Sequence, residues 1–310
     1  MAITLIAVVG ADGFVGNGLA RALNARRIVY GPPQTGEIHV RACSALLREA
    51  DVVVVAHGFR VRPGCNAADY QRSHAAATAA LAPHVRQGAL LLHISSASVL
   101  GTGVGLGNRT PPNPSGFPAP AYAVAKLEED RYLERASAEF GFRVVFLRPA
   151  VVYSAHGAGM IDTVLKLARQ RIVLRCYPRA ARHHLCHMDL LAEVARRVVA
   201  RSDLPDRSYL VVADPFTITN AELEAMTRAA RPRGTVTLPL PLPLLSRLLR
   251  STFHSRIPRF DLRTQGEILG VLHMDTVYDP SETMRVLGID PANYGRDQTL
   301  QPIVNQALRG

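Results

Sequence analysis

The fold is decided by the stretch Gly10-Ala11-Asp12-Gly13-Phe14-Val15-Gly16, which follows the apolar run Ile3–Val9 and opens a helical pattern over Asn17–Asn24. After a strand and before a helix, the first glycine permits a tight turn and the second lets the backbone approach a pyrophosphate. The third lets the helix pack closely on the strand. The helix N-terminus then offers N–H groups and partial positive charge to phosphates. The expected dinucleotide-binding residues of this loop are Gly10, Gly13, Phe14, Val15 and Gly16. A tight turn with no ligand is the alternative.

The first half of the chain alternates short β-branched runs with helical patterns, which is typical of a parallel sheet covered by helices. The expected strands are Ile3–Val9, Arg27–Tyr30, Asp51–Ala56, Ala89–Ser95 and Arg143–Arg148. The expected helices are Asn17–Asn24, Cys43–Glu49, Ala67–Val85 and Ala121–Phe140. Near-continuous Val, Ile and Leu in the strands indicates burial on both faces. The predicted fold class is therefore α/β, a doubly wound parallel sheet of the Rossmann type.

The pattern changes after about Pro149, which predicts a smaller α+β unit in the C-terminal part. We expect residues 1–153 to form the dinucleotide-binding domain and residues 154–310 to form mainly a substrate-binding unit. Residues 185–214 read as a helix and a strand, and we expect them to pack back onto the first domain. Thr102–Pro120 reads as a long loop, which inside a compact domain is usually functional. Ala180–His187 reads as a polar connection.

Charge and composition narrow the class of protein. The 310 residues carry a formal net charge of +11, with 34 arginines and only two lysines, Lys126 and Lys166. The arginines are scattered in no run longer than two, whereas nucleic-acid binders gather positive charge on one face, so a nucleic-acid partner is disfavoured. An anionic small molecule such as a nucleotide diphosphate would suit the positive field. A simple bias toward Ala and Arg explains the charge equally well.

Membrane, disulfide and metal chemistry are also disfavoured. No stretch reaches the roughly 18 apolar residues of a spanning helix. Leu238–Arg250 is a possible surface patch for a membrane, but its prolines favour core packing instead. The four cysteines include no Cys-x-x-Cys pair, so neither a disulfide scaffold nor a zinc ribbon is expected, and a reducing cytoplasm fits best. His183–His187 lacks further ligand spacing, so we expect no metal.

Tyr122 and Lys126 stand four residues apart at the start of a helix opened by Pro120. This spacing places the phenol and the ammonium on one helix face. A tyrosine with a pKa of about 10 is a poor base at neutral pH. A neighbouring ammonium and a cationic nicotinamide both favour the phenolate, which brings proton transfer within range. The same lysine can hydrogen-bond the ribose of a cofactor. A surface helix pair is the alternative.

A run of serines, Ser95-Ser96-Ala97-Ser98, ends the predicted strand Ala89–Ser95. The carboxyl end of a parallel strand faces the crevice where such sheets bind ligands, so a hydroxyl there can orient a substrate oxygen. Ordinary turn chemistry is the other interpretation. The cofactor type stays open, because Val29-Tyr30-Gly31 stands where an acidic residue would bind the adenosine ribose, and no arginine follows it.

Together these features resemble the extended short-chain dehydrogenase/reductase family, the NAD(P)-dependent epimerase/dehydratase group that acts on nucleotide sugars. The matching motifs, besides the glycine loop, are Asp51–Gly58, Ser95–Gly101, Tyr122 with Lys126, Leu147-Arg148-Pro149 with Val152-Tyr153, His187–Leu190 and Val277–Pro280 with Leu287-Gly288. The resemblance covers nearly the whole chain. It implies Ser96 as the catalytic hydroxyl, Tyr122 as acid and base, and Lys126 as cofactor anchor. It also implies NAD or NADP as cofactor.

The resemblance further implies that Ala56, at the end of the third predicted strand, contacts the cofactor. Ser98 and Arg182 are the expected substrate-binding residues. A nucleotide-sugar pocket would be built from the C-terminal unit. The helices Ala67–Val85 and Ala121–Phe140 are those that the family pairs into a homodimer.

Several positions depart from the family pattern. A structural asparagine of the family is His74 here, an aspartate of the third strand is His39, and an arginine that grips the substrate pyrophosphate falls at His183. The Asp-Glu pair of the sugar dehydratases is Ala97-Ser98, so dehydration is not expected. We therefore expect an epimerase or 4-keto reductase. A non-catalytic NAD(P)-binding regulator of the same fold is the alternative.

Overall fold

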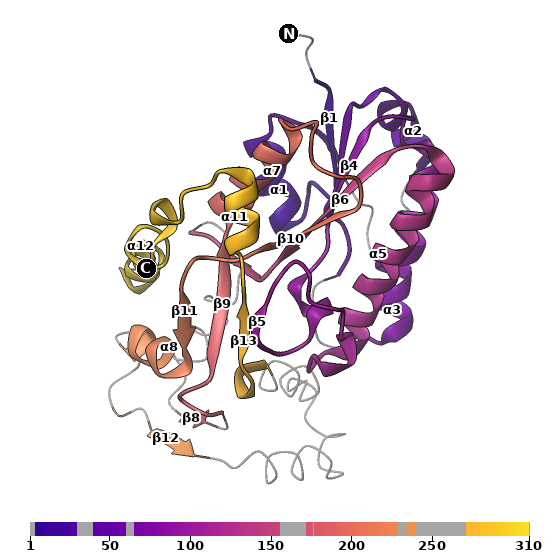
Figure 1. The fold of residues 1–310 in the computed structure, drawn as a ribbon. Coiled ribbons are helices and arrows are strands. Elements are labelled where there is room, and N and C mark those ends of the chain that lie inside the picture. The colour runs from indigo at the N-terminus through magenta and orange to yellow at the C-terminus, as the bar shows by residue number, and fades with distance from the viewer. Residues whose placement is uncertain are drawn as a thin grey trace.

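A computed structural model describes residues 4–29, 40–59, 65–155, 172–175, 177–228, 234, 236–239 and 271–309. Its centre is a six-stranded parallel sheet in the order β10-β6-β4-β3-β1-β2 (Figure 1). The strands are β1 (Ile6–Val9), β2 (Arg26–Ile28), β3 (Val52–Val55), β4 (Leu90–Ile94), β6 (Arg143–Pro149) and β10 (Ser208–Val212). The predicted α/β class is confirmed. The connection through residues 31–37 lies outside the described residues, as does most of Leu238–Arg250.

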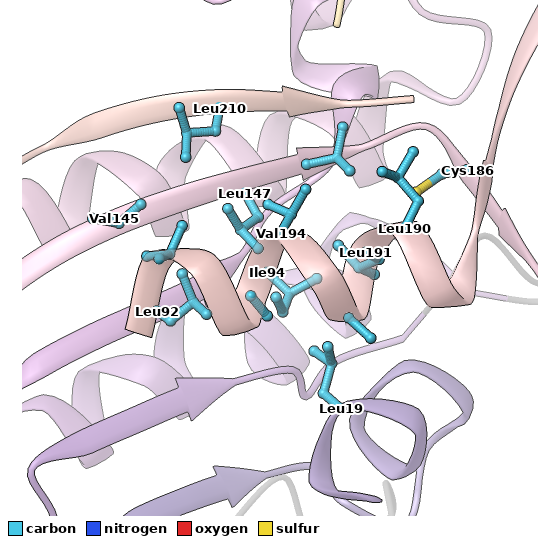
Figure 2. Close-up of a cluster of buried hydrophobic side chains, with 14 of the residues drawn as sticks. Leu19, Leu92, Ile94, Val145, Leu147, Cys186, Leu190, Leu191, Val194 and Leu210 are labelled. Atoms are coloured by element: carbon cyan, nitrogen blue, oxygen red, sulfur yellow. The ribbon is translucent and has the colours of Figure 1, made fainter. Parts of the chain in front are cut away.

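Helices cover both faces of this sheet and make it a three-layer sandwich. One face packs on α1 (Phe14–Ala22), α7 (Met188–Val199) and α11 (Ser281–Leu287). The other packs on α2 (Val40–Glu49), α4 (Ala77–Leu81) and α5 (Pro120–Phe140). Figure 2 shows the first face, where leucines and valines of α7 lie against those of the strands. Burying a Leu or Val side chain stabilises the fold by about 1.5–3 kcal/mol, and β3 buries four valines in succession.

The predicted helix over 67–85 is present but contains a π-helical turn. It runs as α3 (Ala67–Gln71), the π turn Arg72–Ala76, α4 and a final 3-10 turn to His84. Asn66 begins it with a capping box, in which its side chain accepts from the Asp69 N–H and the Asp69 carboxylate accepts from the Asn66 N–H. Such π turns occur often at functional sites.

A second sheet has the strand order β11-β9-β13-β5 (Figure 1). It combines three strands from the carboxyl-terminal part of the chain with β5 from the first half. Its strands are β5 (Gly103–Leu106), β9 (Arg182–His187), β11 (Thr217–Thr219) and β13 (Thr276–Tyr278), and β7 (Val151–Tyr153) also pairs with β9. The expected polar connection Ala180–His187 is therefore mostly a strand. The expected loop Thr102–Pro120 likewise contributes β5. The remaining described elements are β8 (Ile172–Arg175), β12 (Val236–Pro239), α8 (Asn220–Thr227) and α12 (Arg296–Arg309).

A third apolar cluster joins the second sheet to α12. It contains Leu185 and Ile218 of the sheet and residues of α12 such as Leu300 and Ile303. This part therefore has a core of its own. No helix in the described part of the chain is long and apolar enough to cross a membrane.

Candidate active site

The glycine loop connects β1 to α1 and requires glycine at two of its positions for different reasons. Gly10 has φ +83° and its N–H donates to the Ile28 carbonyl at 2.9 Å. A Cβ at Gly10 would lie 2.7 Å from the Cα of His57, so the loop sits directly on the segment after β3. A Cβ at Gly16 would lie only 2.0 Å from the Gly10 carbonyl oxygen. The loop and the first helix turn are thus as close as a backbone allows.

The N-terminus of α1 presents amide groups that no side chain caps. Its N-cap is Gly13, which makes no side-chain cap hydrogen bond, and its first turn holds no acidic residue. Phe14 and Val15 pack against the core, which fixes their amides in place. Ala56 lies beside the loop, since its carbonyl oxygen would be 2.8 Å from a Cβ at Gly10. This cradle of glycines and uncapped amides fits the pyrophosphate of a dinucleotide.

Arg27 of β2 lies across the same loop, a contact that sequence reasoning missed. Its guanidinium donates to the Asn17 side chain at 2.8 Å and to the Ala11 carbonyl oxygen. The residue is exposed, so its positive charge faces solvent beside the loop.

Ser96 and Ser98 are joined at the carboxyl end of β4. Ser96 is the N-cap of a 3-10 turn over Ala97–Leu100, and its Oγ accepts from the Ser98 N–H at 3.2 Å. The Ser98 hydroxyl also donates to Ser96 Oγ, at 2.9 Å. Ser96 is half-buried and Ser98 is buried. Because Ser96 Oγ accepts both bonds, its own proton is the one left to donate to an arriving oxygen.

Tyr122 and Lys126 occupy successive turns at the start of α5, on one face as their spacing predicts. The half-buried Tyr122 ring makes edge contacts with the rings of Tyr70 and His74, at centroid distances of 5.7 and 5.8 Å. Lys126 is only 4% exposed, and its Nζ donates to the Ile94 carbonyl oxygen at 3.0 Å. The ammonium is therefore fixed to the last residue of β4, immediately before the serine run.

Lys126 also donates to Glu129 Oε2 at 3.0 Å. Burial acts to lower the pKa of Lys126, but the Glu129 charge and hydrogen bond, together with the nearby Tyr122 and Asp130, outweigh burial and raise it. Tyr122 and Lys126 lie one helical turn apart on α5. The catalytic role of this pair stays a prediction.

Glu129 is the centre of a buried polar cluster that sequence reasoning did not single out. Its side chain is fully buried, and its Oε1 accepts from the Thr78 hydroxyl at 2.5 Å. Three histidine rings surround the carboxylate, His74 at 3.3 Å, His93 at 3.6 Å and His57 at 3.9 Å. Burial acts to raise the pKa of Glu129, but Lys126, His93 and His74 hold it well below its usual value.

One signal in the sequence could have identified this cluster. Lys126, Glu129 and Leu133 follow each other at helical spacings of three and four, on the same face as Ala123. Leu133 and Ala123 are apolar, so the face that carries Glu129 had to point inward. Read alone, the run Glu128-Glu129-Asp130 is typical of a solvated helix surface.

His74, which replaces the asparagine of the family pattern, sits in the π turn against Tyr122. Its Nε2 donates to the Phe59 carbonyl oxygen at 3.0 Å. A Cβ at Gly58 would lie 2.2 Å from its ring, so the imidazole fits only because residue 58 is glycine. Burial lowers the pKa of His74.

The expected substrate residues differ in their surroundings. Arg182, the first residue of β9, is exposed. Its backbone N–H donates to Asp275 Oδ1 at 2.7 Å, and its guanidinium lies 3.8 Å from the same carboxylate. No contact among the described residues joins it to Ser98. His183 points into the second sheet instead, with its ring bonded to Thr276 at 3.0 Å and to Asn220 at 3.1 Å. His183 is therefore a structural residue of β9.

No group of three His, Cys, Asp or Glu side chains in the described ranges is arranged to hold a metal ion. Two of the three histidines around Glu129 instead turn a ring nitrogen toward a backbone carbonyl. His57 Nδ1 donates to the Ser73 carbonyl oxygen at 3.1 Å, as His74 does to Phe59.

Comparison with protein-family models places the chain in a known family. Residues 6–209 match the NAD dependent epimerase/dehydratase family, and the chain belongs to it. The matched region contains the glycine loop, the serine run and the Tyr122–Lys126 pair. The resemblance inferred from these motifs is confirmed, and with it the NAD(P) dependence that the family description carries. No curated protein sequence matches the chain closely enough to count as a relative.

Solved structures share the whole fold at low sequence identity. MoeE5 in complex with UDP-glucose and NAD is 18% identical, with a TM-score of 0.70 over 98% of this chain and 97% of that one. UDP-glucuronic acid 4-epimerase from Bacillus cereus in complex with NAD is 17% identical, with a TM-score of 0.69 over 98% and 96%. DesIV, a dTDP-glucose 4,6-dehydratase from Streptomyces venezuelae with NAD and TYD bound, is 14% identical, with a TM-score of 0.72 over 99% and 98%.

Proposed function

We propose that the protein is an NAD(P)-dependent oxidoreductase-type enzyme that acts on a nucleotide-activated sugar as an epimerase or a 4-keto reductase. The observation that carries this proposal is the placement of Lys126. Its ammonium donates to the carbonyl oxygen of Ile94, two residues before Ser96, and Tyr122 lies one helical turn earlier on α5. This arrangement supports a site in which Tyr122 transfers the proton, Lys126 provides the cation and Ser96 orients the substrate.

The roles of the three residues follow from their chemistry. The cofactor supplies a nicotinamide that accepts or returns a hydride at a sugar carbon. Tyr122 takes the hydroxyl proton as the sugar is oxidised and returns it on reduction. Ser96 donates a hydrogen bond to the reacting oxygen, with Ser98 holding Ser96 in place. Lys126 stabilises the phenolate and contacts the cofactor ribose. Residues Gly10, Gly13–Gly16 and Ala56 hold the pyrophosphate side of the cofactor.

The substrate class is supported by the bound molecules of the fold relatives, which include UDP-glucose and UDP-glucuronic acid. We place the substrate unit in the second sheet and the elements after residue 153, with Arg182 as a candidate cation for the substrate diphosphate. Ala97 and Ser98 stand where a dehydratase of the family carries two acidic residues, so elimination of water is not part of the proposed reaction.

The helices over 67–84 and α5 pack side by side on one face of the sheet (Figure 1). We propose that their outer surface forms a homodimer interface of a cytoplasmic enzyme. Light scattering would then give twice the chain mass of 33.6 kDa, and a monomeric mass at high concentration would refute the dimer.

The catalytic assignment is tested by Tyr122→Phe during incubation with a panel of nucleotide sugars. Chromatography of the sugar products reports epimerisation, which leaves no net reduced nicotinamide, and nicotinamide absorbance reports a net reduction. Loss of the phenol should lower kcat by about 10²–10⁴-fold, because the proton then has no acceptor, while NAD(P) affinity stays within a few-fold. Tyr132→Phe is the matched control: it lies on the same helix, and its hydroxyl bonds only weakly to the Ala79 carbonyl oxygen at 3.4 Å.

Equal turnover by the wild type and Tyr122→Phe would remove the catalytic assignment. Tight binding of NAD(P) without turnover on a broad panel would favour the second candidate, a regulator that keeps the fold and senses the cofactor. The replacement of an expected pyrophosphate-binding arginine by the inward-pointing His183 is the observation that keeps this candidate in view.

A further inference from the structure

The face of α5 beneath Tyr122 buries two opposite charges with no water between them. Lys126 is 4% exposed and Glu129 is 0% exposed, and the two side chains are joined at 3.0 Å. An ammonium removed from water tends to lose its proton unless a counter-charge is present. A neutral amine could neither stabilise the Tyr122 phenolate nor act as a cation toward a ribose. The proposed chemistry therefore needs something to keep Lys126 charged.

We propose that Glu129 is a positioning residue that keeps Lys126 in its ammonium form and directs it to the carboxyl end of β4. The inference rests on the proposed function, since a charged Lys126 matters to the reaction only if Tyr122 acts as acid and base. Glu129 lies one helical turn after the lysine and is fully buried, so it would act on the reaction through Lys126.

Glu129 itself is held by groups from three other elements, which argues that its position is built and not incidental. Thr78 of α4 donates to its Oε1 at 2.5 Å and also lies 3.1 Å from His57 Nε2. His74 approaches from the π turn and His93 from β4. With Lys126 on Oε2 and Thr78 on Oε1, both carboxylate oxygens are bound and the carboxylate cannot rotate away.

The other charges near the pair do not replace Glu129. Asp130 also acts on the Lys126 charge, but its own charge is compensated by Arg148 of β6, which donates to its Oδ2 at 3.1 Å. Burial lowers the pKa of His57 to about 4, so this ring adds no charge at neutral pH. Among the described residues, Glu129 is the anion that accepts a hydrogen bond from the ammonium directly, at 3.0 Å. Glu129 is thus the resident counter-charge of Lys126.

The scarcity of lysine in this chain makes the test direct. Lys126 and Lys166 are the only two lysines, so lysine labelled with ¹³C at Cε gives two signals, and Lys166→Arg assigns them. In the wild type, the Lys126 signal should keep its charged-state shift to a higher pH than that of an ordinary exposed lysine. In Glu129→Gln, which keeps the side-chain shape but removes the charge, its titration should move down by at least about two pH units.

The matched control is Glu128→Gln, the same change one residue earlier, at a half-buried glutamate whose carboxylate instead accepts from Gln71. It should leave the Lys126 titration unchanged, and Glu129→Asp, which restores the charge, should return most of the shift. Superimposable titrations of the wild type and Glu129→Gln would overturn the proposal. Because this measurement needs no turnover, its outcome is separate from that of the Tyr122→Phe experiment.

A second variant covers the case in which Glu129→Gln does not fold. Thr78→Val removes the hydrogen bond to Glu129 Oε1 and frees the carboxylate to move. The Lys126 titration should then move down by a smaller amount, and an unchanged titration would count against the proposal. In active protein, kcat of Glu129→Gln should fall at least tenfold, with a profile against pH displaced from that of Glu128→Gln and with KM for the sugar little changed.

Discussion

Glycine residues set two of the closest contacts in the molecule. At Gly58, φ is +105° and a Cβ would lie 2.2 Å from the His74 ring, so this glycine makes room for the imidazole that packs on Tyr122. At Gly16, a Cβ would lie 2.0 Å from the Gly10 carbonyl oxygen. Gly13, in the same loop, has φ −74° and a Cβ there would lie 3.3 Å from the same oxygen.

The two loop positions should therefore respond differently to one added methyl group. Gly16→Ala forces α1 away from the loop and should lower the free energy of unfolding by about 1–3 kcal/mol, and weaken NAD(P) binding. Gly13→Ala should change the free energy of unfolding by less than about 1 kcal/mol, since its φ suits any residue. Denaturant unfolding of both variants makes the comparison. Equal losses would contradict the close contact at residue 16.

Among the elements, a buried ion pair joins β6 to α5, the helix that also carries Tyr122 and Lys126. Arg148 of β6, 2% exposed, donates to Asp130 at 3.1 Å, and its guanidinium lies 3.9 Å from the centre of the Tyr209 ring. Because α5 also carries Tyr122 and Lys126, this pair fixes the helix that positions them. A buried pair costs little while both partners are present and much when one is removed.

Asp130→Asn should lower the free energy of unfolding by about 3–5 kcal/mol, because it leaves the Arg148 charge buried and uncompensated. The matched control, Glu139→Gln, changes an exposed acid at the end of the same helix and should stay within about 0.5 kcal/mol of the wild type. Urea denaturation monitored by circular dichroism measures both. A loss below about 1 kcal/mol in Asp130→Asn would show that the pair does not stabilise the packing of α5.

Some elements could be predicted from the sequence because their own residues determine them. The four valines of β3 and the glycines after β1 need no distant partner to be interpreted. β9 could not be predicted, because His183 and His184 are polar residues in a buried strand. Their rings are hydrogen-bonded by groups distant in sequence, namely Thr276 and Asn220 for His183 and the N–H of Tyr278 for His184. For Glu129 the helical spacing indicated an inward face, but its partner Thr78 lies 51 residues away and could not be named from the sequence. Long-range contacts that neutralise polar side chains leave little trace in local patterns.

At the scale of the whole molecule, buried histidines connect stability to pH. Burial lowers the pKa of both His57 and His184 to about 4, and the Nδ1 of His184 accepts from the Tyr278 N–H at 2.8 Å. In the unfolded chain a histidine titrates at about 6.5. The folded protein therefore binds fewer protons between these values, and its stability is fully present above about pH 6.5 and is lost as the pH falls toward 4.

Each of these histidines should remove about 2 kcal/mol of the free energy of unfolding between pH 7 and pH 5. Asp214, whose pKa burial raises to about 6, acts in the opposite direction and offsets about 1 kcal/mol. Denaturant unfolding at the two pH values tests this. His184→Asn, which keeps an acceptor for the Tyr278 N–H, should reduce the loss by about 2 kcal/mol. An equal loss in the wild type and His184→Asn would refute the assignment.

The direct passage from β9 into α7 has a consequence for the modularity of the chain. Strand Arg182–His187 belongs to the second sheet, and helix Met188–Val199 follows with no intervening residue. This helix packs on the first sheet and on α1, where the Met188 sulfur would be 2.6 Å from a Cβ at Gly18. The chain therefore passes directly from the part proposed to bind the sugar to the part proposed to bind the dinucleotide cofactor, and the two parts are not separate stretches of sequence. A new specificity can be acquired by changing side chains on this scaffold, but not by exchanging one half for another by recombination at a single point.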